Sequence, residues 1–127
     1  MPEAMRLLSW NCQGLGNLWT SRSLRKIVRE QALIVCFLME SRLDKDGFEN
    51  LYGNLPYQNK IIVKHPNSGR GLALLWKNSI TLEVINYTVN HVLAMVMEED
   101  GFKWFLTCFY GWLEAQKRKN HGGCWNI

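Results

Sequence analysis

Positions 33–40 read LIVCFLME: seven consecutive apolar residues that end at a glutamate. A continuous apolar run of this length, with two β-branched residues in it, is typical of a strand covered on both of its faces. Such strands occur mostly inside parallel sheets that have helices packed on them. The stretch Leu33 to Met39 therefore predicts a central buried strand, with Glu40 at its carboxyl end.

The segment before this run predicts a second strand and a connecting helix. Met5 to Asn11 is apolar on both alternating sets of positions apart from Arg6, and Thr20 or Ser21 is suited to cap a helix that runs to about Gln31. A strand, a helix and a strand within so few residues form a βαβ unit, whose crossover is right-handed in nearly all proteins. The two strands are then parallel neighbours in one sheet.

Polar side chains follow three of the predicted strands. Asn11 closes the first parallel strand, Glu40 closes the second, and Tyr110 follows a later apolar strand. Because parallel strands end on the same side of a sheet, we expect Asn11 and Glu40 to emerge together, where open α/β sheets bind ligands. One carboxylate beside amide and hydroxyl groups suits Mg²⁺, which keeps several waters and bridges to substrate phosphate. From spacing alone, an equally good interpretation is that these residues merely terminate strands.

The second half of the chain predicts a short helix and an antiparallel meander. Asp44 is suited to cap a helix that ends at Gly53 and turns three side chains inward, namely Phe48, Leu51 and Tyr52. Tyr57 to Lys64 alternates weakly, as an edge strand does. Four further strands are predicted at Gly71–Trp76, Ile80–Tyr87, Val92–Met97 and Phe102–Phe109. Lys77–Ser79 and Glu98–Gly101 have the composition of hairpin turns.

The composition fits one globular domain of 127 residues, with 47% apolar and 20% charged residues, and excludes a disordered chain. The net charge of +4 suits an anionic partner such as nucleic acid without requiring one. No apolar run approaches the roughly 18 residues needed to span a bilayer, so no membrane partner is expected. The cysteines are distant from one another in sequence, which favours reduced thiols and an intracellular protein, nuclear or cytoplasmic. They are Cys12, Cys36, Cys108 and Cys124.

Four blocks of the sequence resemble the endonuclease/exonuclease/phosphatase superfamily, and most of all the endonuclease domain of plant LINE-type (non-LTR) retrotransposons. The blocks are Ser9–Gly16 (SWNCQGLG), Phe37–Leu43 (FLMESRL), Gly71–Lys77 (GLALLWK) and Phe109–Gly111 (FYG). They stand in the expected order and spacing over nearly the whole chain. The resemblance implies a two-sheet α/β sandwich that cleaves phosphodiesters in DNA with a divalent metal ion, Mg²⁺ or alternatively Mn²⁺.

The resemblance also implies roles for individual residues. Asn11 matches an active-site asparagine, Glu40 the metal ligand, and Tyr110 the aromatic hydroxyl near the scissile phosphate. Arg118 matches, loosely, a basic residue that follows the FYG block. Together with Lys117 and Lys119 it is a candidate contact to a nucleic-acid backbone. A second basic stripe lies on the predicted helix, faces away from the sheet and is expected to be solvated: Arg22, Arg25, Lys26 and Arg29.

The sequence departs from the family pattern in its C-terminal part. The family's Asp-x-Asn motif and its Asp-His pair are absent, and no aspartate follows Asp100. In the family these groups orient the attacking water and stabilise developing charge, and general base catalysis alone contributes about 10²–10⁴-fold. We therefore expect residues 1–127 to form a single, incomplete domain that is truncated at its C-terminus and nearly without activity.

Two other functions stay open on the sequence. The chain is alternatively a nucleic-acid-binding remnant without catalysis, or half of an enzyme that a second chain completes. The expected fold is the same in each case and is α/β (α+β) in class. It is the first half of a two-sheet α/β sandwich, with a βαβ unit followed by an antiparallel meander. Because such a half supplies roughly one sheet, the face meant for the second sheet is expected to be apolar and exposed, and to favour self-association.

Overall fold

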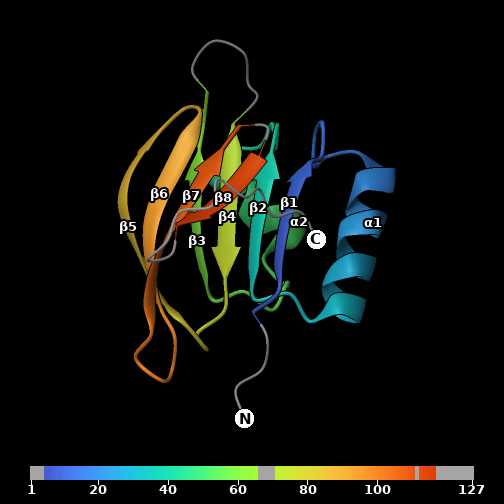
Figure 1. The fold of residues 1–127 in the computed structure, drawn as a ribbon. Coiled ribbons are helices and arrows are strands. Elements are labelled where there is room, and N and C mark those ends of the chain that lie inside the picture. The colour runs from blue at the N-terminus through green and yellow to red at the C-terminus, as the bar shows by residue number, and fades with distance from the viewer. Residues whose placement is uncertain (1–4, 66–70, 111, 117–127) are drawn as a thin grey trace.

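The chain folds into three layers, with two helices on one side of a sheet and a second sheet on its other side (Figure 1). The computed structural model describes residues 5–65, 71–110 and, for the backbone, 112–116. The helices are α1 (Leu18–Gln31) and α2 (Lys45–Tyr52). The first sheet has the order β1-β2-β4-β3 and consists of β1 (Leu7–Asn11), β2 (Val35–Met39), β3 (Asn59–Val63) and β4 (Leu72–Trp76). The second has the order β5-β6-β7-β8 and consists of β5 (Thr81–Thr88), β6 (His91–Met97), β7 (Lys103–Phe109) and β8 (Trp112–Gln116).

These layers confirm the predicted class, a mixed α/β sandwich of two sheets with few helices. The edge position expected for Tyr57 to Lys64 is also confirmed, because β3 is the last strand of the first sheet. Within the described ranges no helix is long and apolar enough to cross a membrane.

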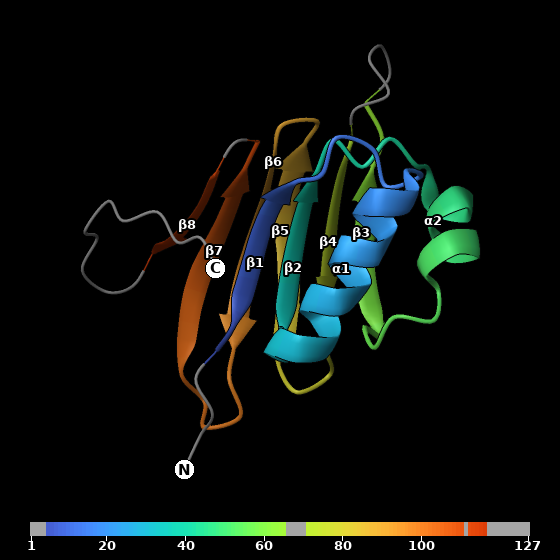
Figure 2. The ribbon, with the colours of Figure 1, turned by 90° about the vertical axis from the view of Figure 1, so that its right-hand side faces the viewer.

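The βαβ unit has the predicted parallel pairing. β1 and β2 run side by side in register, with Asn11 opposite Met39. All five residues of β2 are buried, because α1 lies over one face of the strand and the second sheet over the other (Figure 2). Cys36 and Leu38 pack among the residues under the helices. Val35 and Met39 pack between the sheets, so the unbroken apolar run reflects burial on both faces.

Helix α1 begins earlier than predicted, because Asn17 caps it rather than Thr20 or Ser21. The Asn17 side chain accepts a hydrogen bond from the Trp19 amide at 2.8 Å, which pairs one of the free donors of the first turn. The Thr20 hydroxyl instead donates to the Cys12 carbonyl at 3.4 Å and so ties the helix to the end of β1. Three residues of capping type lie close together in this segment, and composition alone did not distinguish among them.

Helix α2 has the predicted ends but a narrower inner face than predicted. The Asp44 side chain accepts a hydrogen bond from the backbone of the first turn at 2.8 Å, and Gly53 follows the last turn. Phe48 and Tyr52, one turn apart, are buried. The prediction for Leu51 is wrong, because its side chain is 47% exposed. In a helix of eight residues one stripe is enough to hold it on the sheet, and Leu51 lies at the margin of that stripe.

The turn at Lys77–Ser79 carries the chain from the first sheet to the second, so the prediction of a hairpin there is wrong. β4 pairs with β2 and β3, whereas β5 pairs with β6. Turn composition indicates a local reversal of the chain but not the strand with which the next segment pairs. The hairpin predicted at Glu98–Gly101 is confirmed, because β6 and β7 are antiparallel neighbours on either side of it. Gly101 donates its amide to the Glu98 carbonyl at 2.9 Å and has a φ of +90°, which favours glycine.

The two sheets pack face to face around a shared apolar core. Phe37 and Leu74 enter it from the first sheet, Val92 and Leu106 from the second, and all four are fully buried. The prediction of an exposed apolar face on the first sheet is therefore wrong. The chain covers that face with its own second sheet, because the strands after Lys77–Ser79 pair with one another and fold back over it.

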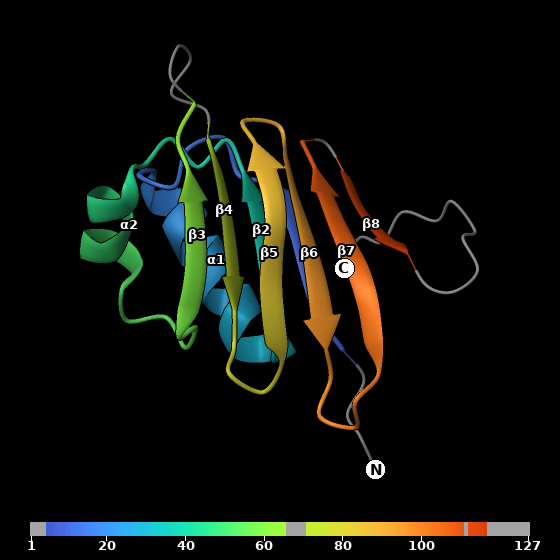
Figure 3. The same ribbon diagram turned by 90° about the vertical axis from the view of Figure 1, so that its left-hand side faces the viewer.

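Apolar side chains are exposed instead on the outer side of the second sheet. Phe105 and Phe109 alternate with buried residues along β7 and are 47% and 37% exposed. Met95 of β6 lies opposite Phe105 and is half-buried. Among the described elements, both helices lie on the far side of the molecule from this face (Figure 3).

Candidate active site

The carboxyl ends of β1 and β2 meet at one rim of the first sheet, as the sequence predicts. Beyond the strands the backbone stays paired, because the Cys12 amide donates to the Met39 carbonyl at 3.0 Å. The Gly14 amide then donates to the Glu40 carbonyl at 2.7 Å. The loops that follow β1 and β2 are thus fixed to each other by backbone hydrogen bonds.

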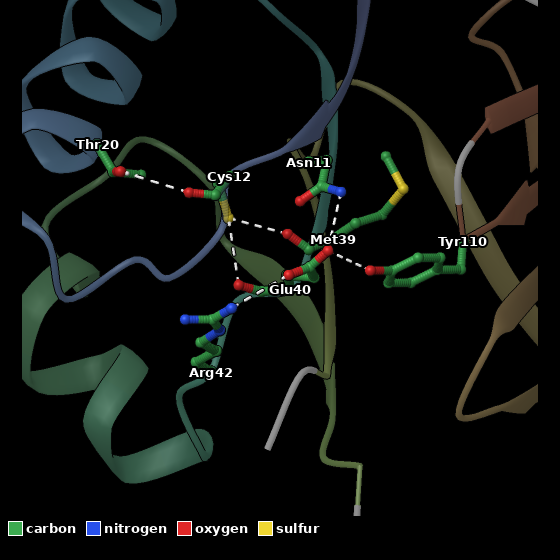
Figure 4. Close-up of polar contacts among 7 residues, drawn as sticks. All are labelled: Asn11, Cys12, Thr20, Met39, Glu40, Arg42 and Tyr110. Carbon is green, nitrogen blue, oxygen red and sulfur yellow. Dashed lines mark hydrogen bonds and ion pairs between the residues drawn. The ribbon is translucent and has the colours of Figure 1, made fainter. Parts of the chain in front are cut away.

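The Glu40 carboxylate is the centre of the polar contacts at this rim (Figure 4). Its Oε2 accepts a hydrogen bond from Asn11 Nδ2 at 2.9 Å and another from the Tyr110 hydroxyl. Its Oε1 forms an ion pair with Arg42 Nη2 at 3.3 Å. The predicted meeting of Asn11, Glu40 and Tyr110 is therefore present, and their catalytic and metal-binding roles stay predictions.

Glu40 and Arg42 have backbone conformations that L-residues rarely adopt. Their φ angles are +55° and +57°, in the left-handed region, which costs a non-glycine residue roughly 1–2 kcal/mol. The turn that these angles produce lets both side chains point to the same place, so that Arg42 pairs with the carboxylate two residues before it. Strained residues of this kind persist where the surrounding structure holds them, and they are frequent at functional sites.

Gly71, just before β4, allows a close approach to this strained turn. Its φ is +67°, and a Cβ atom there would lie 2.8 Å from the Val63 carbonyl oxygen. The Gly71 carbonyl accepts a hydrogen bond from the Ser41 amide at 3.3 Å, and Ser41 is fully buried. A side chain at position 71 would therefore press on the end of β3, and its Cβ would also lie 3.3 Å from the Ser41 hydroxyl next to Glu40.

The surroundings of Glu40 favour its ionised form. Hydrogen bonds from Tyr110 and Asn11, together with the charge of Arg42, hold the pKa of the Glu40 carboxyl below its ordinary value of 4.5. The side chain is 13% exposed, so partial burial opposes this shift without reversing it. Glu40 is thus a carboxylate at neutral pH, and its Oε1 accepts a single hydrogen bond from the described residues.

Tyr110 is the residue that the second sheet contributes to the site. It follows β7 directly, and its amide donates to the Asn90 carbonyl, in the turn between β5 and β6, at 2.7 Å. Its hydroxyl reaches Glu40 at the end of β2 in the first sheet. The sheet-to-sheet packing therefore decides whether this tyrosine contacts the carboxylate.

Two residues at the rim were not among the site residues predicted from sequence. Arg42 lies within the FLMESRL block, but the spacing of the residues gave no indication that its side chain pairs with Glu40. Cys12 donates its thiol to the Met39 carbonyl at 3.1 Å and so fixes the last residue of β2 before Glu40. Burial raises the pKa of the Cys12 thiol to about 11, which excludes a reactive thiolate at neutral pH.

The other residues singled out in the sequence have different outcomes. Lys117, Arg118 and Lys119 lie outside the described residues, so their predicted contact to nucleic acid stays a prediction. On α1, Arg25 donates to Asn54 Oδ1 at 3.0 Å and lies over the Tyr52 ring, which is a structural role. The remaining members of that stripe are exposed, as expected for a solvated face: Arg22, Lys26 and Arg29.

The donor set at the rim fits a hard divalent cation held by one carboxylate. Mg²⁺ accepts one or two protein carboxylates and completes its shell with water and substrate phosphate. Glu40 supplies the carboxylate, and the Asn11 side chain supplies an amide oxygen next to it. No group of three or more His, Cys, Asp or Glu residues suited to a metal occurs in the described part of the chain. A closed cage of protein ligands, as in structural zinc sites, does not fit these residues.

The mixed fold of two sheets and few helices is consistent with the first half of an α/β sandwich of the endonuclease/exonuclease/phosphatase type. A solved structure with a similar fold is the human Nocturnin catalytic domain with bound sulfate anion, at a TM-score of 0.54. The match covers 81% of this chain and 48% of that one, so the chain spans about half the length of the matched structure. The sequence identity is 19%, and the likeness shows the fold. No protein-family model and no curated protein sequence matches the chain.

Proposed function

We propose that the chain carries the asparagine–glutamate–tyrosine part of a Mg²⁺-dependent DNA phosphodiesterase site, of the retrotransposon endonuclease type. The observation that carries the proposal is the Glu40 carboxylate, held ionised at the sheet rim by Asn11 and Tyr110. The four sequence blocks that resemble those endonucleases include all three residues. The fold of the matched solved structure is a second, independent support.

Each residue has a distinct task in this proposal. Glu40 would hold Mg²⁺, which supplies positive charge to neutralise a phosphate oxygen during cleavage. Asn11 fixes the orientation of the carboxylate through its amide hydrogen bond. The Tyr110 hydroxyl is a donor at the same rim and would turn to a phosphate oxygen when a substrate is bound. Arg42 limits the negative charge at the rim, which favours the approach of a phosphodiester.

We further propose that this chain alone turns over very slowly. A phosphodiesterase needs a group that activates water opposite the leaving group, and the sequence lacks the family's Asp-x-Asn and Asp-His motifs. Because general base catalysis contributes about 10²–10⁴-fold, its loss alone would put turnover near background. An intracellular setting, nuclear or cytoplasmic, is part of the proposal, and the free thiols of Cys12, Cys36 and Cys108 support it.

The test is a nicking assay on supercoiled plasmid with Mg²⁺ or Mn²⁺, using the wild-type chain, Glu40→Gln and Glu99→Gln. Glu99 is an exposed carboxylate in the turn between β6 and β7 and serves as the matched control. We expect all three proteins to give nicking at the level of buffer alone. Robust nicking by the wild type and Glu99→Gln that disappears in Glu40→Gln would support the site and overturn the proposed inactivity. Robust nicking that survives in Glu40→Gln would overturn the proposed site itself.

A further inference from the structure

Two small pockets lie near Glu40, and each is lined by a residue that contacts its carboxylate. The first has a volume of about 240 Å³ and includes Arg42, whose guanidinium pairs with Glu40. The second has a volume of about 60 Å³ and includes Tyr110, whose hydroxyl donates to Glu40. Both are smaller than the roughly 300–1,000 Å³ of pockets that enclose an organic ligand, but they are large enough for single anionic groups.

The first pocket is basic. Lys64 lines it together with Arg42 and is exposed, and it has no hydrogen-bond or ion-pair partner among the residues that the structure describes. The one carboxylate of the pocket is Asp44, and it already accepts the backbone hydrogen bond that caps α2. Two cationic groups therefore border this pocket, and its one carboxylate already accepts a hydrogen bond from α2.

The second pocket is lined by hydrogen-bonding groups. His65, Asn90 and Tyr110 border it, with Val89 as the apolar member. An imidazole N–H and an amide can donate to an anionic oxygen, and the Tyr110 hydroxyl could do so after turning from Glu40. None of the residues that line this pocket is a carboxylate. The pocket therefore suits an acceptor-rich group such as phosphate.

Consecutive residues just after β3 line the two pockets. Lys64 lines the first and His65, the next residue, lines the second. Glu40 contacts one residue of each pocket, Arg42 of the first and Tyr110 of the second. The donors of the two pockets therefore outnumber the groups that a single phosphate at Glu40 would contact.

We propose that Lys64 and His65, together with Arg42, bind the backbone phosphates that flank the reacting phosphate of a nucleic-acid strand. This inference rests on the proposed function and deepens it, because it names the residues that would hold the strand beyond the reacting phosphate. Contacts from lysine and arginine to backbone phosphates position a strand without reading its sequence. They also make its affinity fall with salt.

The experiment measures binding without turnover. Fluorescence polarisation follows a labelled thymidine oligonucleotide of about 12 nucleotides in EDTA over a salt series, with the full chain. The variants are Lys64→Gln, the double variant Lys64→Gln/His65→Gln, and the control Lys26→Gln, an exposed lysine on α1. Competition with thymidine monophosphate compares a single phosphate with the strand. A thermal melt of each variant checks that it is folded.

We expect the wild type to bind with a Kd of about 10⁻⁴–10⁻⁶ M, the range of non-specific binding. The double variant should bind several-fold more weakly, and the slope of log K against log salt should fall by about 0.7 for each phosphate that the variant no longer binds. Lys26→Gln should match the wild type, and thymidine monophosphate should compete poorly. Equal affinity and slope in the folded double variant would overturn the inference, as would a wild type that does not bind. An equal weakening in Lys26→Gln, or tight binding of the monophosphate, would overturn it as well.

This outcome is separable from that of the proposed function. Glu40→Gln removes a negative charge from the rim, so it should bind the oligonucleotide at least as tightly as the wild type in EDTA. If strand binding depends on Lys64 while metal binding does not depend on Glu40, the result supports the phosphate contacts and overturns the proposed phosphodiesterase site. The reverse pattern would leave the metal site in place and overturn the proposed contacts to the strand.

Discussion

Tyr110 and Glu40 stand 70 positions apart in the chain, and the Tyr110 hydroxyl donates a hydrogen bond to the Glu40 carboxylate. The first residue follows a strand of the second sheet and the second follows a strand of the first. The hydrogen bond therefore exists only when the sandwich has closed. It makes the polar rim a product of the whole fold rather than of the βαβ unit that carries Asn11 and Glu40.

The Tyr110 hydrogen bond should be visible in the titration of Glu40. It is the largest of the interactions that lower the pKa of this carboxyl, so Tyr110→Phe should raise that pKa toward 4.5. Tyr87→Phe, at an exposed tyrosine of β5, should leave it unchanged. The measurement is an NMR titration of the Glu40 side-chain carboxyl carbon. An unaltered pKa in Tyr110→Phe would contradict the hydrogen bond.

Stability should depend on Glu40 in a defined pH range. Its pKa in the folded chain lies below the ordinary value of 4.5, so the stability it contributes is present above about pH 4.5. That contribution is lost as the pH falls through the folded-state pKa. The difference in thermal stability between wild type and Glu40→Gln should thus shrink between pH 7 and pH 3. A difference that stays constant over this range would show that the carboxylate gains nothing from its donors.

The packing of the two sheets can be tested with neighbouring residues of β7. Leu106 is fully buried between the sheets, so Leu106→Ala should lower the free energy of unfolding by about 2–5 kcal/mol. Phe105 faces the other way and is 47% exposed, so Phe105→Ala should cost less than about 1 kcal/mol. Denaturant unfolding of both variants measures the two values. Similar small decreases in both would mean that the second sheet does not cover the first.

The start of α1 can be tested at its cap. Asn17→Ala removes the side chain that accepts the Trp19 amide and should cost about 0.5–2 kcal/mol of stability. Ser23→Ala, at an exposed position inside the helix, should be neutral or slightly stabilising because alanine favours helices. Urea unfolding distinguishes the two. If Asn17→Ala has no effect, the helix is capped elsewhere.

The buried thiols should react only when the chain opens. Burial raises the pKa of Cys12 and of Cys36 to about 11 and also raises the pKa of Cys108. Alkylation at pH 8, in a Cys124→Ser background, should label these three thiols far more slowly in the native chain than in urea. Mass spectrometry of the labelled peptides gives the rate for each site. Fast labelling of Cys12 in the native chain would contradict the burial of its thiol.

Local sequence patterns predicted the part of the fold in which strands that follow each other in the sequence also pair with each other. The unbroken run in β2, the parallel βαβ unit and the hairpin at Glu98–Gly101 follow from burial and from turn chemistry. The crossing at Lys77–Ser79 did not follow, because a turn of the same composition serves a hairpin or a passage between sheets. The consequence was large, since that crossing decides whether the inner face of the first sheet is exposed or covered.

The candidate site was predictable where it follows from strand direction. Asn11 and Glu40 share a rim because β1 and β2 are parallel and in register. Tyr110 was a candidate because it follows an apolar strand, but its place near the reacting phosphate came from the resemblance, because no local rule connects the end of β7 to β2. The ion pair of Arg42 with Glu40 depends on two left-handed backbone conformations that their residue types do not indicate.

Metal binding by Glu40 is tested most directly by titrating Mn²⁺, as a spectroscopic substitute for Mg²⁺, and measuring free Mn²⁺ by electron paramagnetic resonance. The chain without nucleic acid is compared with Glu40→Gln and with Glu99→Gln. One Mn²⁺ bound by the wild type and by Glu99→Gln, and none bound by a folded Glu40→Gln, is the predicted result. Equal Mn²⁺ binding by all three proteins, or none by the wild type, would contradict a metal site at this rim.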